Sequence, residues 1–487
     1  MMGPVSFDAV DLGTDRREAV DATSAVRMAG YWVDLNHTDE RFLLMVRSTD
    51  YLAVRGVLDA RYTERFLPTQ LPIIPLEVPP AVSLRVPGSK SHTNRALVCA
   101  ALADGVSRLA GVLFADDTEA MLDVLDRLGI GLEVDREEFV VTVVGGSGSL
   151  PDGPAVLDAR QSGTTSRFVL PMLALGSGTY LLDGHEQMRS RPFGDLISAV
   201  AQLGARVEGS SLPLTVNGNG VLRGGTVALP GSISSQFLSG LLLSAPCSAE
   251  VTKIEITDEL VSKPYVDLTL ATMRSFGATV ENHDYREFIV APTGYKARDV
   301  VLESDASAAS YFFAAAAITG GRVRVEGLGR NTLQGDLRFV DLLEQMGAEV
   351  VRGEDFTEVA GVGPLRGIDV DMSDISDTAQ SLAVVAPFAE TPTRVRGIGF
   401  IRKKETDRIA AVVHELTRLG IAATEEADGF VVEPGTPQPG VVETYDDHRM
   451  VMSFALLGLV HPGIVIDNPN CVSKTFPNFF DVLAQLG

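Results

Sequence analysis

The sequence has few cysteines and no excess of positive charge. Its three cysteines, Cys99, Cys247 and Cys471, form neither a CxxC pair nor a zinc-like spacing. This pattern argues against a structural disulfide or a zinc site and favours a reducing compartment. The net charge of −23 argues against a large surface for nucleic acid or anionic membrane, because phosphate groups need a basic face. A small anionic substrate remains compatible with this charge, since a few clustered cations can dominate one cleft.

Long apolar runs are also absent. The longest apolar helix-like run, residues 308–318, is too short to cross a bilayer. The first forty residues carry many acidic side chains and no apolar segment of the kind found in a secretory signal. The sequence therefore predicts a cytoplasmic protein that binds neither membrane nor nucleic acid.

A repeat is present along most of the chain. The 487 residues are enough for two or more domains, and a helix-like segment followed by glycine and a strand-like run recurs. The glycines lie 67 to 75 residues apart, and each fits the left-handed position just past a helix C-terminus. Such spacing predicts six structural units, three in each of two domains. The marker glycines are Gly129, Gly204, Gly277, Gly347, Gly420 and Gly487.

A second set of predicted helices lies between the markers. These segments are rich in Ala and Leu, and each begins at a loop that contains Ser, Thr, Asp or Gly. Helix starts with such caps present free backbone N–H groups and the positive end of the helix dipole. Several of them facing one cleft would form a receptor for anions. The predicted ranges are 94–102, 165–175, 235–243, 306–318, 378–386 and 447–457.

Residues 1–76 stand outside the repeat and are predicted to be an N-terminal extension with a linker. They include the only tryptophan, Trp32, and most of a Pro-rich stretch at 67–80 that is typical of an extended linker. A small appended element and a partly ordered arm both fit this composition. The sequence assigns the extension no function.

The loop VPGSKSHTNR at 86–95 combines a turn with a lysine, hydroxyls and an arginine at the start of a predicted helix. A nucleotide P-loop needs GxxxxGK[ST], but Ser89 precedes Lys90 here, and Leu84 stands where the first glycine would be. The P-loop interpretation therefore fails. Another kind of anion site and an ordinary helix cap both remain.

Similar polar stretches recur at other predicted helix starts. Each taken alone is also compatible with a surface turn. Together they favour a site for anions in an acidic chain, since arginine forms bidentate hydrogen bonds with carboxylate and phosphate. The stretches are LDARQSGTTSR (157–167), QMRSRP (187–192), GSISSQFLSG (231–240), SKPY (262–265), SDISDTAQS (373–381), IRKKETDRI (401–409), YDDHRM (445–450) and CVSKTFP (471–477).

These stretches, in their order and spacing, resemble the EPSP synthase (3-phosphoshikimate 1-carboxyvinyltransferase) family from about residue 77 to 487. The motifs are PGSKSHTNRA, SGTTSR, MRSRP, SSQFLSG, SKPY, DASAASYFFAAAA, KETDRI, DDHRM and KTFP. The resemblance implies an α/β fold, a two-domain inside-out α/β barrel in which each domain has three βαβαββ units. It implies one domain at 89–303 and another at 77–88 plus 304–487, with the active site in the cleft between them.

The resemblance also implies a reaction. The enolpyruvyl group of phosphoenolpyruvate would pass to the 5-hydroxyl of shikimate 3-phosphate with release of phosphate, a step of the shikimate pathway toward chorismate and the aromatic amino acids. No metal and no organic cofactor are implied, and a monomer is expected. Two polyanions need fixed positive charge around them. The addition needs a base for the hydroxyl proton and an acid for the methylene carbon.

The same resemblance implies a role for each motif residue. Asp377 and Glu405 are the candidate acid–base carboxylates with Lys90 assisting; Asp377 is favoured near the 5-hydroxyl, and the assignment of acid and base stays open. The residues expected at shikimate 3-phosphate are Lys90, Ser91, Arg95, Ser234, Ser235, Gln236, Ser262, Tyr265, Asp377 and Lys404. Those expected at phosphoenolpyruvate are Lys90, Gly163, Arg191, Gln236, Arg408, Arg449 and Lys474.

Two positions depart from the family pattern. Gln161 stands where the family usually has Asn, and Phe400 stands where it often has Asn. Phenylalanine cannot supply the hydrogen bonds that Asn would give to the sugar-like ring. Gly163 keeps the small residue that the family has beside phosphoenolpyruvate, which predicts inhibition by glyphosate.

Three alternatives are weighed against this interpretation. The sister enzyme that acts on UDP-N-acetylglucosamine shares the fold, but it usually begins with Lys-Asn-Ala and carries a loop cysteine, whereas Cys99 lies in a predicted helix. A catalytically silent binding protein would not need the acid–base residues that the chain retains. An enzyme for a related cyclic phosphate is favoured by Phe400 and Gln161.

Overall fold

The computed structural model describes residues 7–11, 33–38, 41–47 and 67–487. Three strands near the N-terminus form one antiparallel sheet in the order β1-β3-β2. They are β1 (Phe7–Asp11), β2 (Val33–Thr38) and β3 (Arg41–Arg47). The N-terminal extension thus contains a sheet, whereas Trp32 lies outside the described residues.

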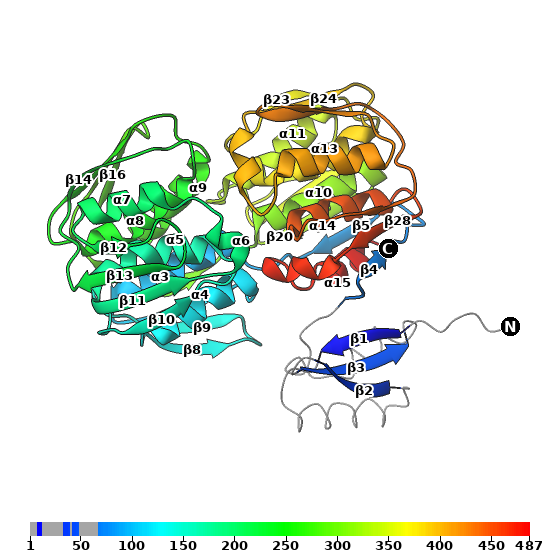
Figure 1. Ribbon diagram of the computed structural model, residues 1–487. Coiled ribbons are helices and arrows are strands. Elements are labelled where there is room, and N and C mark those ends of the chain that lie inside the picture. The colour runs from blue at the N-terminus through cyan, green and yellow to red at the C-terminus, as the bar shows by residue number, and fades with distance from the viewer. Residues whose placement is uncertain (1–6, 12–32, 39–40, 48–66) are drawn as a thin grey trace.

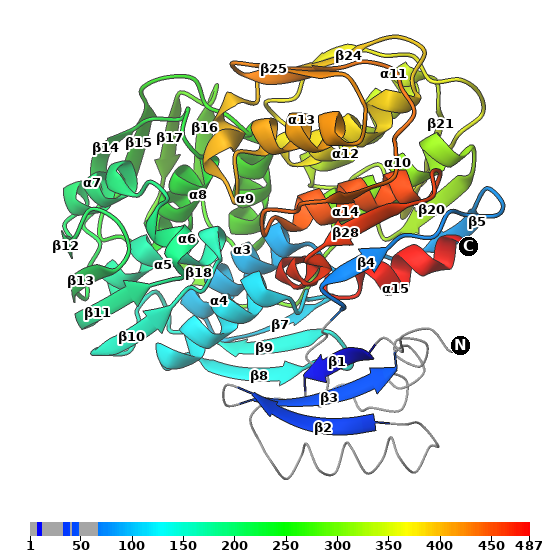
Figure 2. The same cartoon turned by 45° about the vertical axis from the view of Figure 1, so that its right-hand side comes forward.

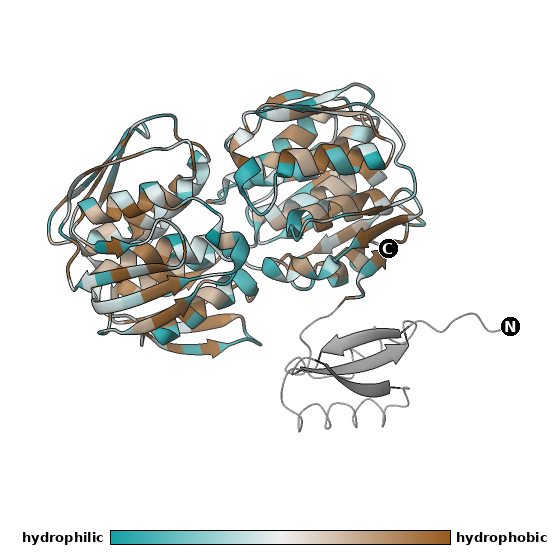
Figure 3. Cartoon of the chain, in the orientation of Figure 1, coloured by the Kyte–Doolittle hydropathy of each residue, from teal (hydrophilic) through white to brown (hydrophobic). Residues whose placement is uncertain are grey.

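The buried hydrophobic side chains of the described residues form two separate clusters. One gathers residues between Ala96 and Leu302. The other gathers Ile73, Leu84 and Val86 with residues from Ala306 onward. The clusters are the cores of two lobes that lie side by side (Figure 1). Hydrophobic positions run along the helices and strands of both lobes (Figure 3).

The first lobe contains layers of helices and mixed sheets. Its helices are α3 (Lys90–Leu102), α4 (Asp116–Arg127), α5 (Gly163–Met172), η3 (Leu173–Leu175), α6 (Glu186–Arg189), α7 (Gly194–Gln202), α8 (Ser235–Ser244), η4 (Ala245–Cys247) and α9 (Lys263–Ser275). Its strands are β6 (Ala103–Asp104), β7 (Val106–Ala110), β8 (Gly131–Asp135), β9 (Val140–Val144), β10 (Ala155–Asp158), β11 (Ser177–Asp183), β12 (Arg206–Glu208), β13 (Leu214–Asn219), β14 (Gly225–Leu229), β15 (Thr252–Ile256), β16 (Val280–His283), β17 (Glu287–Val290), β18 (Tyr295–Lys296) and β19 (Val300–Val301).

The second lobe has a similar composition of elements. Its helices are α10 (Ala306–Thr319), η5 (Gly335–Arg338), α11 (Phe339–Met346), η6 (Ser376–Thr378), α12 (Ala379–Val385), η7 (Ala386–Phe388), η8 (Gly399–Lys403), α13 (Arg408–Arg418), α14 (His448–Gly458), η9 (Pro469–Lys474), α15 (Phe479–Leu483) and η10 (Ala484–Leu486). Its strands are β4 (Gln70–Pro72), β5 (Ala81–Leu84), β20 (Arg322–Glu326), β21 (Glu349–Arg352), β22 (Phe356–Ala360), β23 (Asp369–Asp371), β24 (Thr393–Arg396), β25 (Ala423–Glu426), β26 (Gly429–Val432), β27 (Gly440–Val442) and β28 (Ile464–Asp467).

The main sheets of the two lobes share one connection pattern. In the sheet β10-β11-β13-β12, the first pair is parallel and the next two pairs are antiparallel. The sheets β19-β7-β9-β8, β14-β15-β17-β16 and β23-β24-β26-β25 have the same sequence of pairings, and so does β5-β20-β22-β21. The sheet β27-β28-β4 keeps the parallel pair and one antiparallel pair. In each parallel pair, at least one helix lies between the two strands in the sequence, because parallel strands must be joined by a crossover connection.

The marker glycines end helices in both lobes. Five of them, all except the terminal Gly487, have φ between 79° and 115°, where other residues are strained. The predicted helices between the markers are also found, with α3 starting earlier than expected, at Lys90 rather than 94. Helix α10 is so rich in Ala and Phe that it is buried on all sides and forms the centre of its lobe.

The Pro-rich stretch at 67–80, predicted to be an extended linker, contains a strand of the second lobe. Strand β4 within it pairs with β28, and the backbone N–H of Ile73 donates to the carbonyl of Ile464. Ile73 itself is buried in the second core. Sequence pattern alone missed this strand because its partner lies almost four hundred residues later. No helix in the described part of the chain is long and apolar enough to cross a membrane.

The chain passes between the lobes at two adjacent segments. Gly88 and Ser304 form an antiparallel bridge, and the N–H of Ser89 donates to the carbonyl of Glu303. A Cβ on Gly88 would lie 1.9 Å from the carbonyl oxygen of Gly111, so only glycine fits there. The first lobe is therefore inserted into the second, which Figure 2 shows with β4 and β5 beside β28 and α15.

Candidate active site

A cleft between the lobes is formed largely by the starts of helices. From the first lobe come the N-terminal turns of α3, α5, α8 and α9, and from the second come η6, α13 and α14. The residues that line the cleft are Lys90, Ser91, Arg95, Thr164, Arg167, Arg191, Pro192, Ile233, Ser234, Ser235, Gln236, Val261, Ser262, Tyr265, Asp377, Phe400, Lys403, Lys404, Glu405, Arg408, His448 and Arg449. All the residues predicted for the site are in this set except Gly163 and Lys474, which lie directly behind it.

Side-chain caps fix these helix starts. Ser89 accepts a hydrogen bond from the N–H of His92, and Ser162 and Ser234 cap α5 and α8 in the same way. In the second lobe, Asp407 caps α13 and Asp447 caps α14. Each cap holds the next residues at the positive end of a helix dipole, where anions are stabilised. The caps therefore fix where each helix begins, and the packing of the two lobes brings these helix starts to one cleft.

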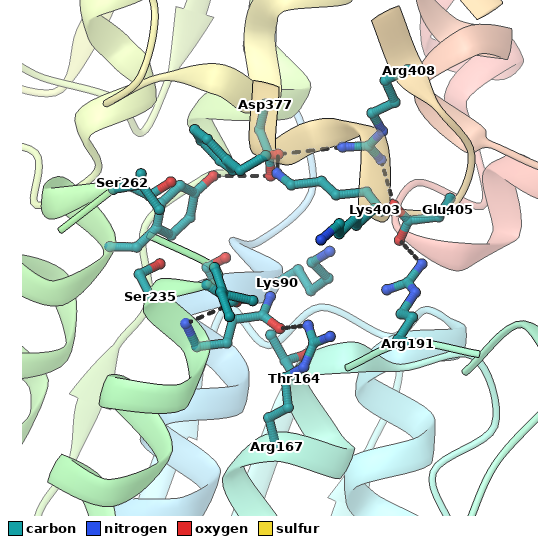
Figure 4. Close-up of a pocket in the computed structure, with 18 of the residues that line it drawn as sticks. Lys90, Thr164, Arg167, Arg191, Ser235, Ser262, Asp377, Lys403, Glu405 and Arg408 are labelled. Carbon is teal, nitrogen blue, oxygen red and sulfur yellow. Dashed lines mark hydrogen bonds and ion pairs between the residues drawn. The ribbon is translucent and has the colours of Figure 1, made fainter. Parts of the chain in front are cut away.

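Asp377 is surrounded by cations. Its carboxylate lies 2.8 Å from Arg449 Nη2 and 3.4 Å from Arg408 Nη1, and Lys404 Nζ donates to it directly. Burial opposes ionisation of this carboxyl, but Arg449, Lys404 and Arg408 together hold its pKa well below the usual range. Asp377 is therefore an ionised carboxylate. Figure 4 shows its contact with Arg408.

Glu405 is surrounded by a second group of cations. Its Oε2 lies 2.7 Å from Arg408 Nη2, and its Oε1 lies 3.1 Å from Arg191 Nη2 and 4.0 Å from Lys474 Nζ. Burial again opposes ionisation, but Arg191, Arg408 and Lys474 hold the pKa of this carboxyl well below its usual range. Arg191 belongs to the first lobe and Glu405 to the second, so this ion pair joins the lobes (Figure 4).

Asp117 lies between two lysines and was not predicted from the sequence. Its Oδ2 is 3.2 Å from Lys90 Nζ, and its Oδ1 is 2.9 Å from Lys474 Nζ. Lys474 also donates to the backbone carbonyl of Gln161. Asp117 is buried at the start of α4 and connects a lysine of its own lobe with one of the other. Such a carboxylate offsets the repulsion between the two ammonium groups.

The opposite side of the cleft presents hydroxyl and amide groups. Ser234 and Ser235 start α8, and Ser262, at φ 54°, precedes α9. Gln236 accepts a hydrogen bond of 2.6 Å from Arg167 Nη1. Neutral donors at a helix start suit the phosphate and hydroxyl groups of a polar substrate.

Arg95, predicted as a ligand of the substrate, makes four hydrogen bonds within the protein itself. Its guanidinium donates to the hydroxyls of Thr269 and Ser239 and to the carbonyls of Ser91 and Tyr265. Burial lowers its pKa to about 10. These contacts tie α3 to α8 and α9, so Arg95 also fixes the position of the hydroxyl side.

Gly163 leaves room between three polar groups. A Cβ at this position would lie 3.2 Å from Arg167 Nη1 and from Arg191 Nη1, and 3.4 Å from Gln236 Oε1. Any larger residue would push the arginines from their positions. Phe400, by contrast, places its ring in the wall of the cleft, 5.8 Å from Lys404 Nζ, and offers no hydrogen bond there.

Four further residues line the cleft that were not predicted as site residues from the sequence: Arg167, Lys403, Thr164 and His448. Arg167 is buried, with its pKa lowered to about 9 by burial and by Arg191. Both ring nitrogens of the buried His448 lack a hydrogen-bond partner within the described residues. The only available signal was that each lies within a motif stretch. Within that same part of the chain, no group of His, Cys, Asp and Glu could hold a metal ion.

This geometry is that of a two-lobed α/β protein whose cleft, lined by cations and helix starts, is suited to small anions. The sequence model of the EPSP synthase (3-phosphoshikimate 1-carboxyvinyltransferase) family matches residues 80–483. A 3-phosphoshikimate 1-carboxyvinyltransferase of Trichormus variabilis is 46% identical over 83% of this chain and 96% of its own length. A protein of the same name from Vibrio cholerae serotype O1 is 43% identical over 83% of this chain and 96% of its own length.

A solved structure agrees with the sequence comparisons. The EPSP synthase of Acinetobacter baumannii superposes with a TM-score of 0.74 at 26% sequence identity, covering 86% of this chain and 98% of that one. The chain belongs to the EPSP synthase family and is a transferase. The resemblance found in its motifs is thereby confirmed.

Proposed function

We propose that this enzyme transfers the enolpyruvyl group of phosphoenolpyruvate to the 5-hydroxyl of shikimate 3-phosphate and releases phosphate. The observation that carries the proposal is the pair of cation groups in one cleft, one around Asp377 and one around Glu405. Two polyanions can be held side by side only where fixed positive charge offsets their repulsion. The family and its named relatives support the same reaction.

The group around Glu405 suits phosphoenolpyruvate. Its expected ligands are Lys90, Gly163, Arg191, Gln236, Arg408, Arg449 and Lys474. Arginine forks and lysine ammonium groups match a compact ligand with a carboxylate and a phosphate. The space over Gly163 is the basis for expecting glyphosate to compete with this substrate.

The hydroxyl side suits shikimate 3-phosphate. Its expected ligands are Lys90, Ser91, Arg95, Ser234, Ser235, Gln236, Ser262, Tyr265, Asp377 and Lys404. Asp377 lies between Lys404 and Tyr265, where a ring hydroxyl would meet a carboxylate. We assign Asp377 as the base that takes the proton of the 5-hydroxyl.

Proton delivery to the methylene carbon falls to Glu405, with Lys90 assisting. Glu405 as described is too weakly basic to hold a proton, because Arg191, Arg408 and Lys474 stabilise its charge. An anionic substrate that takes over these cations would remove that stabilisation and raise the pKa of the carboxyl. Substrate binding itself would thus convert Glu405 into an acid.

The finer architecture belongs to the same proposal. We infer two domains, 89–303 and 77–88 plus 304–487, each an inside-out α/β barrel of three βαβαββ units, and the whole chain a monomer. Strand β4 (Gln70–Pro72) and Ile73 join the second domain, so the N-terminal extension ends before β4 rather than at residue 76. Support comes from the recurring sheet pattern and from the two separate cores. Opening and closing of the lobes about the crossing at Gly88 and Ser304 would admit substrates and then exclude water.

Phosphate release from phosphoenolpyruvate, measured with and without shikimate 3-phosphate, tests the reaction. Release is expected only when both substrates are present, and shikimate-independent release or none at all would refute the proposal. Lys90→Met and Asp377→Ala should each lower kcat by at least about 10²-fold, because each removes a group placed at the proton transfers. Lys253→Met and Asp341→Ala, which break exposed ion pairs elsewhere, are matched controls and should leave kcat unchanged.

Glyphosate provides an independent test of the phosphoenolpyruvate side. Inhibition should be competitive with phosphoenolpyruvate, since both would occupy the space over Gly163. An active enzyme that glyphosate does not inhibit would contradict this part of the assignment.

A second acceptor is favoured by one observation, the ring of Phe400 in the cleft wall. An enzyme for a related cyclic phosphate would use that apolar wall instead of a hydrogen bond. Comparing kcat/KM for shikimate 3-phosphate with kcat/KM for analogues that lack one ring hydroxyl distinguishes the two acceptors.

A further inference from the structure

Behind Tyr265, outside the lining of the cleft, lies another buried carboxylate, that of Asp336. Asp336 belongs to η5 and is only 4% exposed. Its Oδ2 accepts hydrogen bonds from Tyr265 OH at 2.8 Å and from the hydroxyl of Ser307. Its Oδ1 has no hydrogen-bond partner within the described residues. No arginine or lysine of that part of the chain lies within ion-pair distance of Asp336, in contrast to Asp377 with its three cations.

Tyr265 bridges the two carboxylates. Its hydroxyl oxygen lies 2.8 Å from Asp336 Oδ2 and 3.2 Å from Asp377 Oδ2. A phenol has one proton to donate, so it can serve only one of these acceptors at a time. The shorter contact indicates that Tyr265 donates to Asp336 while both carboxylates are ionised. Its oxygen then remains free to accept a hydrogen bond from Asp377 once that carboxyl gains a proton.

We propose that Asp336 receives, through the hydroxyl of Tyr265, the proton that Asp377 takes from the acceptor hydroxyl of the substrate. Asp336 does not touch the substrate, so it is a positioning residue that acts through Tyr265. This inference rests on the proposed function, because it uses Asp377 as the base.

The proton balance is simple. The substrate O–H bond breaks as its oxygen forms the new bond to carbon, and the proton passes to Asp377 Oδ2. Asp377 then gives this proton to the oxygen of Tyr265, while the original phenol proton moves to Asp336 Oδ2. Tyr265 and Asp377 end in their starting states, and Asp336 holds one proton. When phosphate leaves, the proton returns along the same path to the departing phosphate, so Asp336 is ionised again before the next turnover. No oxidant, metal or further reactant takes part.

The relative proton affinities favour this direction. Burial, together with the charge of Asp377, raises the pKa of Asp336 to about 6, while the cations hold the pKa of Asp377 well below its usual range. A proton therefore moves from the weaker base to the stronger one. Asp377 is restored to its ionised form, in which it stabilises Arg408, Arg449 and Lys404.

The surroundings of Asp336 define the pH dependence. The titratable groups that face it are Tyr265 from α9, Asp377 from η6 and Arg449 from α14, while α10 supplies the non-titrating Ser307. Above pH 6 Asp336 is ionised and can accept a proton, whereas below pH 6 it is already protonated. The relay predicts that kcat falls on the acid side of about pH 6.

Asp336→Asn tests the relay because it keeps the shape and the hydrogen bonds but cannot accept a proton. We expect kcat at pH 8 to fall about tenfold, which is less than the roughly 10²-fold or more expected for a group that exchanges a proton with the substrate directly, with KM for both substrates little changed. The acid limb near pH 6 should disappear. Asp341→Asn, an exposed carboxylate on the next helix, is the matched control and should keep both kcat and the pH profile.

Two further variants separate a relay from a structural role. Ser307→Ala removes a donor to the charged form of Asp336, so the acid limb should move to higher pH. In a Tyr265→Phe background, Asp336→Asn should cause little additional loss, since the path is already broken. Additive losses of kcat in the double variant would overturn the relay. So would an Asp336→Asn enzyme that keeps the acid limb or the full wild-type kcat.

Infrared spectroscopy of the substrate-free protein separates this inference from the reaction itself. A carboxyl band should appear as the pH falls through about 6 in the wild type and in Asp341→Asn, and be missing in Asp336→Asn. Absence of that band in the wild type would refute the relay whatever the activity. Failure of phosphate release with the band present would refute the proposed function instead.

Discussion

The loss of Asp447 should destabilise the second lobe and inactivate the enzyme. This carboxylate is fully buried, caps α14 through the N–H of Arg449 at 2.9 Å, and lies 2.7 Å from Arg408 Nε. Replacing it with alanine removes a helix cap, which costs about 1 kcal/mol. It also removes one of the two counterions that lie 2.7 Å from Arg408, and the loss of one partner of a buried pair costs about 3–5 kcal/mol.

Remaining partners reduce this second cost. Arg408 keeps Glu405 at 2.7 Å and Asp377 at 3.4 Å, so the lower end of the range applies. We therefore expect Asp447→Ala to lower the free energy of unfolding by about 4 kcal/mol. For a lobe of this size each 1 kcal/mol corresponds to roughly 2–4 °C in Tm.

Chemical denaturation followed by circular dichroism measures this change, and phosphate release measures the loss of activity. Asp447→Asn keeps the cap and should recover about 1 kcal/mol of the loss. Asp341→Ala should change stability by less than about 1 kcal/mol, because its pair with Arg352 lies near the surface and is only partly buried. A loss below about 1 kcal/mol in Asp447→Ala would show that the buried network does not hold the helix starts.

Two further predictions concern the cleft. Gly163→Ala should raise KM for phosphoenolpyruvate several-fold with a smaller effect on kcat, because the added Cβ would lie 3.2 Å from the guanidinium groups of Arg167 and Arg191. Steady-state kinetics measure this change, and an unchanged KM would contradict the crowding. Because the pKa of Glu405 is depressed in the folded protein, its ionised form stabilises the fold above the ordinary pKa of about 4.3, and this stability is lost as the pH falls below that value. Urea denaturation of wild type and Glu405→Gln should therefore show a stability difference at pH 7 that shrinks toward pH 3, and a difference that does not depend on pH would refute this linkage.

The helix starts were predictable because each carries its own local signal. Ser89, Ser162, Ser234 and Asp447 are cap residues next to apolar helical runs, so both the elements and most of the cleft could be predicted from them. Glycine spacing likewise indicated where helices end, and five markers have the expected positive φ.

Asp117 and Asp336 could not be predicted because their roles depend on packing between distant segments. Asp117 meets Lys474, 357 residues later, only when the lobes are in contact. Asp336 meets Tyr265, 71 residues earlier, across the same boundary. Nothing in the sequence beside either aspartate distinguishes it from a surface carboxylate. Strand β4 was missed for the same reason, since its pairing with β28 is not local.

The insertion of one lobe into the other has a consequence for synthesis of the chain. Strand β5 (Ala81–Leu84) leaves the ribosome before the first lobe, but its parallel neighbour β20 follows only after that lobe is complete. Strand β4 waits still longer, for β28 near the C-terminus. The first lobe can thus fold during translation, whereas in the second lobe β5 lacks its partner until β20 emerges and β4 lacks its partner until β28 emerges. Premature termination near residue 460 would leave an intact first lobe attached to exposed strand edges that favour aggregation.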